Sequence, residues 1–110
     1  MAHKALDAKA DEVVILDLRK LSFSFDFFVL CSAVSDRRIQ TIAEDIREKL
    51  SNGGERSGHE EGRPDGGWVL LDYGSVVCHI FEPEARRFYG LERLWADAPH
   101  LSVPKRRNHR

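Results

Sequence analysis

The chain has 110 residues, of which 42% are hydrophobic and 32% charged, and its formal net charge is -1. This length fits one domain with one hydrophobic core, and the near-neutral charge excludes a protein that binds nucleic acid through an overall basic surface. No apolar run approaches the roughly 20 residues that span a bilayer, and residues 1–12 lack the apolar core of a signal peptide. We therefore expect a cytosolic protein.

The first half of the chain predicts a short helix, two strands and a longer helix. The short helix covers residues 2–10, and the first strand, Val13–Leu18, is a continuous apolar run of the kind buried on both faces. The second strand covers Phe27–Cys31. The longer helix, Asp36–Leu50, follows Ser35 as its N-cap and has one apolar stripe: Ile39, Ile42, Ala43, Ile46 and Leu50.

The second half predicts a hairpin followed by a helix. Residues 55–67 are polar and glycine-rich, which favours a short edge strand at most and then a mobile loop. The hairpin Trp68–Phe81 turns at Tyr73 and Gly74. Pro83 suits the first position of a helix, and Gly90 divides that helix into Glu84–Tyr89 and Leu91–Trp95.

These elements together predict an α/β fold with a small mixed sheet flanked by helices. We expect residues 1–101 to form a single domain and the basic tail, residues 102–110, to be disordered. Cys31 and Cys78 lie among apolar residues in predicted strands, so reduced, buried thiols are expected.

A search for catalytic residues finds no complete set. Nucleotidyl transfer requires carboxylates that hold two metal ions about 3.5–4 Å apart, but Asp17 and Asp72 end different strands and no Asp-x-Asp pair follows the turn at Gly74. The sequence has no ligand spacing for structural zinc, no P-loop and no G-x-G-x-x-G motif, so we expect neither a metal nor a cofactor. Cys31 and His79 could form a thiolate–imidazole pair. The favoured interpretation is that both are interior strand residues and that His79 is hydrogen-bonded and structural.

Binding is the remaining class of function. His59, Glu60 and Glu61 are interpreted as solvated loop charges rather than as metal ligands. Trp68 begins a strand after a flexible segment, and Asp72 and Tyr73 lie at the hairpin tip, where exposure is expected. Aromatic and acidic residues at an exposed sheet edge form a plausible contact surface for a basic partner. From these residues alone, a buried Trp68 and an Asp72 that only fixes the turn remain the alternative.

Two segments resemble the ribosomal silencing factor (RsfS, or Iojap-like) family. Residues 68–81 follow its W-V-x-x-D-Y-G hairpin and V-V-x-H-x-F strand, and Glu84 through Pro99 follow E-x-R-x-F-Y-x-L-E-x-L-W-x-D-A-P. Residues 26–42 resemble D-x-F-V-I-C-S-G-T-S-x-R-H-V-x-A-I. The chain departs from the family at Ser75, where Asp is common, at Ala33, where Gly is common, and at Arg38, where His is frequent.

The resemblance implies a nucleotidyltransferase-like topology without enzymatic activity. It also implies that the protein docks on the large-subunit ribosomal protein numbered fourteen, at the intersubunit face, where it blocks subunit joining and represses translation. The partner-binding residues expected on this basis are Trp68, Asp72, Tyr73, Ser75 and Asp26. A homodimer is expected when the protein is free. A small nucleotide-handling enzyme is the alternative, and a contribution of the tail to ribosome association stays open.

Overall fold

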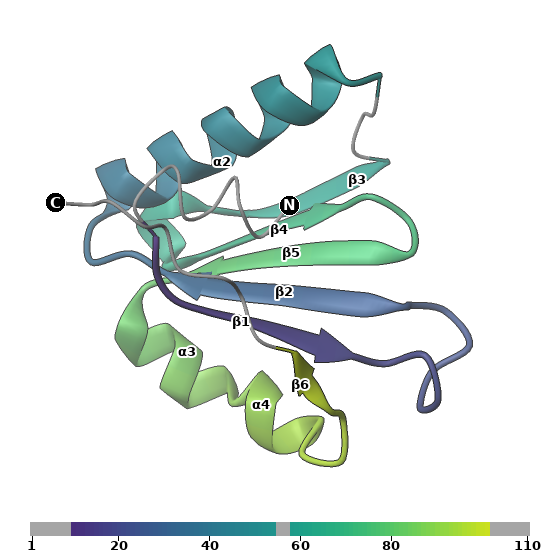
Figure 1. Cartoon of the computed structure of the whole chain (residues 1–110). Helices are drawn as coiled ribbons and strands as arrows, with labels where there is room; N and C mark the ends of the chain where they lie inside the picture. Colours follow the sequence, from purple (N-terminus) through teal and green to yellow (C-terminus); the bar gives the residue numbers. More distant parts are fainter. Residues whose placement is uncertain (1–9, 55–57, 102–110) are drawn as a thin grey trace, which may run out of the picture.

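A six-stranded sheet with helices on both faces forms the centre of the molecule in the computed structural model, which describes residues 10–54 and 58–101 (Figure 1). The strand order is β3-β4-β5-β2-β1-β6. β2 and β5 are parallel and every other pair is antiparallel, which confirms the predicted mixed sheet. The strands are β1 (Asp11–Asp17), β2 (Phe27–Ser32), β3 (His59–Arg63), β4 (Trp68–Asp72), β5 (Val76–Phe81) and β6 (His100–Leu101).

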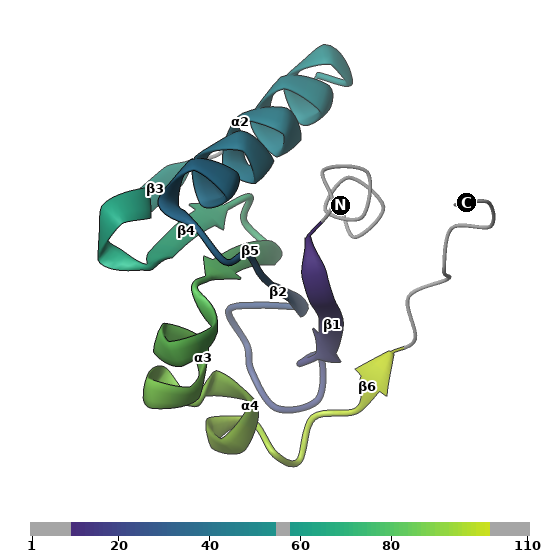
Figure 2. The same ribbon diagram turned by 90° about the vertical axis from the view of Figure 1, so that its left-hand side faces the viewer.

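The helix α2 (Asp36–Asn52) covers one face of this sheet (Figure 2). It begins where predicted, because the side chain of Ser35 accepts a hydrogen bond from the backbone N–H of Arg38 at 3.1 Å. Its buried residues are Ile39, Ile42, Ala43 and Ile46. They pack against β2, β4 and β5 through Val29, Cys31, Val69, Leu71, Cys78 and Ile80.

The helices α3 (Pro83–Tyr89) and α4 (Leu91–Leu94) cover part of the opposite face (Figure 1). Gly90 separates them as predicted, with a φ of 58° that favours glycine. Glu82 caps α3, since its Oε1 accepts hydrogen bonds from the N–H groups of Glu84 and Ala85. The core on this side contains Leu16, Leu18, Phe28, Leu30, Val77, Phe81 and Ala98, with Trp68, Leu70, Ala85, Leu91 and Trp95 packed against it.

Two expectations about the sheet and its connections need correction, and one strand was not predicted. β1 is mostly half-buried rather than buried on both faces, because only the two-residue β6 continues the sheet beyond it. The segment after β3 is a 3₁₀ turn, Pro64–Gly66, rather than a loop without regular structure. β6 was not predicted, since two residues are too few to give a periodic signal. The expected N-terminal helix and basic tail lie outside the described residues, apart from the buried Ala10.

Candidate functional site

The part of the sheet that α3 and α4 leave open is formed by β3 and β4. Side chains alternate between the faces of a strand, and paired residues of antiparallel strands share a face. The register pairs Trp68 with Arg63, Leu70 with Glu61 and Asp72 with His59. We call this surface the β3–β4 face, made by His59, Glu61, Arg63, Trp68, Leu70 and Asp72. A hollow of about 110 Å³, lined by Glu61, Gly62, Trp68 and Leu70, lies on it.

Trp68 is the main apolar residue of the β3–β4 face. Its indole stacks on Phe81 with ring centroids 5.0 Å apart and contacts the Tyr89 ring at 4.5 Å. Its Nε1–H donates a hydrogen bond to Nδ1 of His79 at 3.2 Å. Trp68 is half-buried, so one part of the indole is fixed against the core while another part stays available for contact.

His79 lies directly under this indole in the middle of β5. Its side chain is buried, with 3% of its surface exposed, and this burial lowers the pKa of His79 to about 4. The interpretation of His79 as an interior, hydrogen-bonded residue is confirmed. The alternative pair with Cys31 is wrong, because the register aligns His79 with Leu30 and so directs Cys31 to the α2 side of the sheet.

Both cysteines are free and buried, as expected, and both lie on the α2 side of the sheet. A hydrogen bond with Cys31 and burial raise the pKa of Cys78. The thiolate form of Cys78 is therefore disfavoured, and its sulfur is not prepared for nucleophilic chemistry.

The other predicted contact residues lie at the opposite end of β4. Asp72 Oδ1 accepts a hydrogen bond from the N–H of Gly74 at 2.8 Å, which fixes the hairpin turn. The carbonyl of Ser75 accepts hydrogen bonds from the N–H groups of Asp26 and Phe27, at 2.7 and 3.0 Å. These bonds bring the β1–β2 loop and the hairpin turn together, and both Ser75 and Asp26 are exposed.

The expected exposure of Tyr73 and Asp72 is wrong in part. Both are half-buried, and Tyr73 packs against the core on the α2 side, away from the β3–β4 face. Trp68 and Asp72 share the face but are four residues apart, which is roughly 13 Å along a strand. The five predicted residues therefore form a strip along β4 and its turn, rather than one compact cluster.

The acidic residues near this strip form local ion pairs. His59 contacts Glu61 at 2.7 Å, and this hydrogen bond raises the pKa of His59. Glu60 points to the other face and pairs with Arg47 at 3.0 Å. Asp17 forms an ion pair with Arg19, which lowers the pKa of Asp17 to about 2. Asp17 and Asp72 lie three strand spacings apart, which is about 14 Å. Among residues 10–54 and 58–101, no three His, Cys, Asp or Glu side chains meet in a way that could hold a metal ion.

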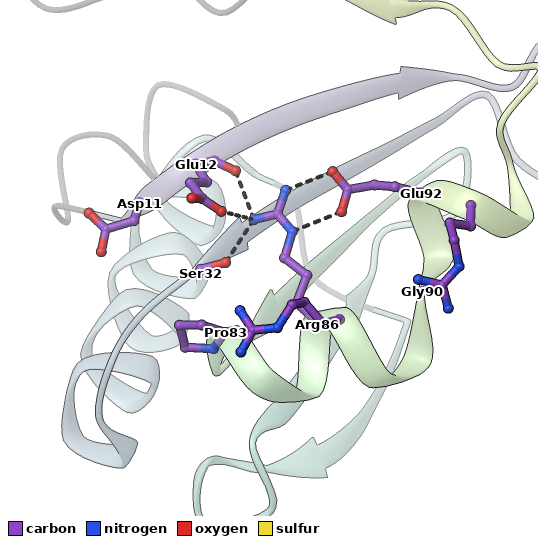
Figure 3. Close-up of a pocket in the computed structure, with 9 residues that line it drawn as sticks. Asp11, Glu12, Ser32, Pro83, Arg86, Gly90 and Glu92 are labelled. Atoms are coloured by element: carbon purple, nitrogen blue, oxygen red, sulfur yellow. Dashed lines mark hydrogen bonds and ion pairs between the residues drawn. The ribbon is translucent and has the colours of Figure 1, made fainter.

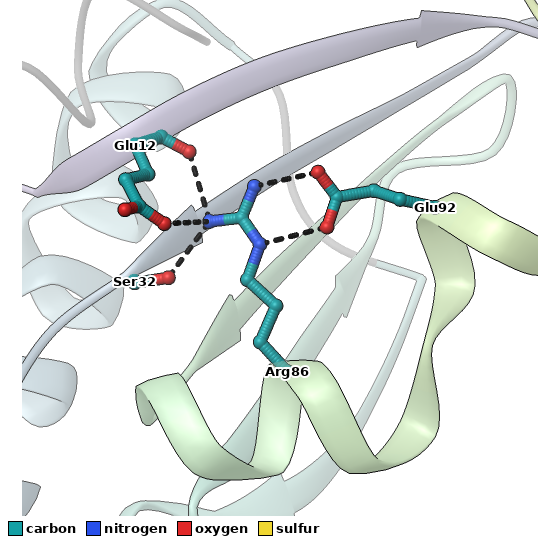
Figure 4. A network of polar contacts seen from close by, with 4 residues as sticks. All are labelled: Glu12, Ser32, Arg86 and Glu92. Atoms are coloured by element: carbon teal, nitrogen blue, oxygen red, sulfur yellow. Dashed lines mark hydrogen bonds and ion pairs between the residues drawn. The ribbon is translucent and has the colours of Figure 1, made fainter.

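A larger cavity, of about 540 Å³, lies at the end of β2 beside α3 (Figure 3). Arg86 is buried at its base, with 7% of its surface exposed. Its Nε and Nη2 donate to the two carboxylate oxygens of Glu92, at 3.0 and 3.1 Å. Its Nη1 donates to the carbonyl of Glu12 at 2.8 Å and to Ser32 Oγ at 2.7 Å (Figure 4).

This arrangement ties α3 and α4 to β1 and β2. The Arg86 guanidinium lowers the pKa of Glu92, so the carboxylate stays ionised near neutral pH and has no proton to donate as a general acid. The backbone of Glu12 has a φ of 49°, and its carbonyl accepts one of the bonds from Arg86. The role of Arg86 was not predicted from the sequence. Its only signal is an arginine six residues before a glutamate, across the helix break at Gly90.

Comparisons with known proteins place this geometry in a family. The family model described as "Ribosomal silencing factor during starvation" matches residues 1–110. The chain belongs to this family. It is 38% identical to the ribosomal silencing factor RsfS of Bacillus subtilis over 93 residues, which are 84% of this chain and 79% of the relative.

Two further relatives agree with this assignment. The chain is 32% identical to the chloroplastic protein Iojap of Zea mays over 104 residues, which are 94% of this chain and 45% of the plant protein. A crystal structure from Bacillus halodurans has a TM-score of 0.80 and 34% identity, and the match covers 92% of this chain and 91% of that one. Within the described residues, no helix is long and apolar enough to cross a membrane.

Proposed function

We propose that this ribosomal silencing factor acts in the cytoplasm, where it binds the large ribosomal subunit and prevents the small subunit from joining. The proposed contact is the ribosomal protein numbered fourteen, at the intersubunit face. The docking surface is the β3–β4 face together with the turn that carries Ser75 and the neighbouring Asp26. The observation behind this proposal is a half-exposed Trp68 on an open sheet face, beside a hollow that Glu61 also lines.

The chemistry of this surface suits a basic protein partner. Trp68 offers a rigid aromatic ring whose inner edge is already ordered, so binding costs little side-chain entropy. Glu61 and Asp72 add negative charge on the same face, and charges at the rim of an interface mainly guide association. Ser75 supplies no charge at a position where the family commonly has Asp, so we expect Asp72 and Asp26 to provide the acidic character near the turn.

We also propose that the protein has no enzymatic activity. The ionisable network around Arg86 joins helices to strands through bonds that use four of its five N–H donors. Incubation with nucleoside triphosphates and magnesium should give neither hydrolysis nor transfer. Turnover that is lost in Asp17→Ala or Asp72→Ala would favour the nucleotide-handling alternative.

Co-sedimentation with isolated large subunits, small subunits and joined ribosomes tests the docking surface. The parent should sediment with large subunits alone. Trp68→Ala should lose at least about 2 kcal/mol of binding free energy, which is the scale of a central interface residue. Val34→Ala, which shortens an exposed side chain in the connection between β2 and α2, outside the β3–β4 face, is the control. A folded Trp68→Ala variant that binds like the parent would remove the β3–β4 face from the proposal.

A homodimer of the free protein is a separate proposal. The helices α3 and α4 expose Phe88 and Leu94, with 77% and 72% of their surfaces accessible, and a second copy could cover them. Light scattering at high micromolar concentration should give the mass of a dimer; a monomer mass throughout would exclude it.

A further inference from the structure

The contacts of Trp68 differ in how strongly they fix the ring. The rings of Phe81 and Tyr89 hold the indole by stacking and tilted contact, which tolerate sliding and rotation of the ring within its plane. The hydrogen bond from Nε1 to His79 Nδ1 is directional. Of the contacts described for this indole, the hydrogen bond alone distinguishes one orientation of the ring from its flipped form.

His79 is itself held in one orientation. Its imidazole lies edge-on to Phe28, with centroids 4.6 Å apart, and parallel to Phe81 at 6.0 Å with an interplanar angle of 7°. Because Nδ1 accepts the indole hydrogen, the ring proton must reside on Nε2. Nε2 is buried and has no hydrogen-bond partner among the described residues.

The unpaired Nε2 is a cost that an apolar residue would avoid. A buried polar group without a partner destabilises the folded state, because it loses its hydrogen bonds to water and gains none in return. Leucine or methionine at this position would fill similar space between Phe28 and Phe81 without this cost, but neither could accept the indole N–H. The feature that histidine adds is therefore the acceptor that faces Trp68.

We propose that His79 is a positioning residue of the docking surface: its Nδ1 fixes the orientation in which Trp68 presents its exposed edge to a basic ribosomal protein. This inference rests on the proposed function, because the surface that His79 organises is the proposed docking surface. His79 is buried and acts through Trp68, without touching the partner itself.

Variants at His79 separate positioning from packing. His79→Leu and His79→Met remove the acceptor, whereas the side-chain oxygen of His79→Asn can lie near the place of Nδ1. We expect the Leu and Met variants to weaken large-subunit binding roughly three- to tenfold, the equivalent of one hydrogen bond. The Asn variant should stay within about twofold of the parent. The two acceptor-free variants ensure a result if one of them fails to fold, which circular dichroism detects.

A double-mutant cycle with Trp68→Phe gives the decisive comparison. Phenylalanine has no N–H, so His79→Leu should cause no further loss of binding in that background. Equal losses in both backgrounds would mean that His79 only supports packing, and would overturn the inference. Trp68→Ala serves as the control for the proposed function. If Trp68→Ala binds like the parent, the docking surface itself is wrong; if it loses binding while His79→Leu does not, only the positioning role is wrong.

The indole N–H resonance of Trp68 in a nitrogen-15 NMR spectrum provides a readout without ribosomes. Trp95→Phe removes the other indole signal and so assigns it. The Trp68 resonance should move upfield in His79→Leu and His79→Met and remain near the parent position in His79→Asn. An unchanged resonance in the acceptor-free variants would show that the hydrogen bond is not formed in solution, and would overturn the inference.

Discussion

At the scale of residues, a polar contact between an interior and a surface side chain organises the site. His79 is neutral because burial among aromatic rings makes its charged form unfavourable. A neutral imidazole can accept the indole N–H, whereas a protonated one cannot. The burial of His79 and the orientation of Trp68 are therefore parts of the same arrangement, and the pH dependence of folding should report on it.

The free energy of unfolding should fall as the pH decreases from about 6.5 to about 4. In this window the unfolded chain binds a proton on His79 and the folded protein does not, so acid favours the unfolded state. A pKa lowered from 6.5 to about 4 corresponds to on the order of 3 kcal/mol across the window. Urea unfolding of the parent and of His79→Leu measures the difference, which removes terms common to both proteins. Parallel pH profiles of the two would contradict a buried neutral His79.

Asp72 has a structural role in the turn and a proposed role in partner binding, and one substitution can separate them. Its Oδ1 accepts the Gly74 N–H, and its charge is proposed to contact a basic partner. Asp72→Asn keeps an acceptor for the turn but removes the charge. We expect it to weaken large-subunit binding by about 1 kcal/mol at low ionic strength and by much less at high salt, because salt screens exposed charges.

Co-sedimentation at several salt concentrations measures the effect of Asp72→Asn. Glu48→Gln, an exposed charge on α2 at the opposite face of the sheet, is the matched control and should bind like the parent. A loss in Asp72→Asn that is independent of salt would mean that the charge does not contact the partner.

At the scale of elements, the β3–β4 pair depends on one close backbone approach. Gly62 in β3 has a φ of 86°, and a Cβ at this position would lie 2.0 Å from the carbonyl oxygen of Trp68. Gly66, in the following turn, has no heavy atom within 4 Å of its would-be Cβ. The two glycines are therefore a matched pair for substitution.

Gly62→Ala should destabilise the fold by about 2–3 kcal/mol, because it combines an unfavourable φ with a backbone clash. It should also weaken ribosome binding, since β3 must move away from Trp68. Gly66→Ala should remain close to the parent in both respects. Thermal unfolding and co-sedimentation of the two variants provide the comparison. A Gly62→Ala variant as stable as the parent would contradict the described register of β3.

The attachment of α3 and α4 to the sheet depends on the contacts of Arg86. Arg86→Met removes the guanidinium that Glu92, Ser32 and the Glu12 carbonyl share. The expected loss is about 2–3 kcal/mol, less than for a fully buried ion pair because Glu92 is partly exposed. Arg87→Met, at an exposed position on the same helix, should change stability little. Equal melting temperatures for both variants would contradict the structural role of Arg86.

Local sequence signals predicted most of the elements because each signal was complete within its segment. Ser35 and the apolar stripe define α2, and Pro83 and Gly90 define the ends of α3. β6 and the contacts of Arg86 depend on segments far apart in the chain, so no local pattern contains them. The exposure of Tyr73 was predicted wrongly. A turn residue is usually exposed, but here tertiary packing against the α2 side buries part of the ring.

At the scale of the whole molecule, the sheet separates two different surfaces. One side is covered by the long α2, and the other is only partly covered by α3 and α4, which leaves the β3–β4 face open (Figure 1). The family resemblance led to the proposed function. The register of β3, β4 and β5 shows which side chains share the open face. The central claim is the proposed steric exclusion of the small subunit, which requires a rigid body bound to the large subunit and no catalytic centre.

A subunit-joining assay tests this claim most directly. Isolated large subunits are incubated with the protein before small subunits are added, and the fraction of joined ribosomes is measured on a density gradient. The parent should reduce joining in proportion to the large subunits it occupies, whereas Trp68→Ala, at the same concentration, should leave joining close to the protein-free level. A parent that occupies the large subunit while joining proceeds normally, or a folded Trp68→Ala variant that blocks joining as well as the parent, would contradict the account.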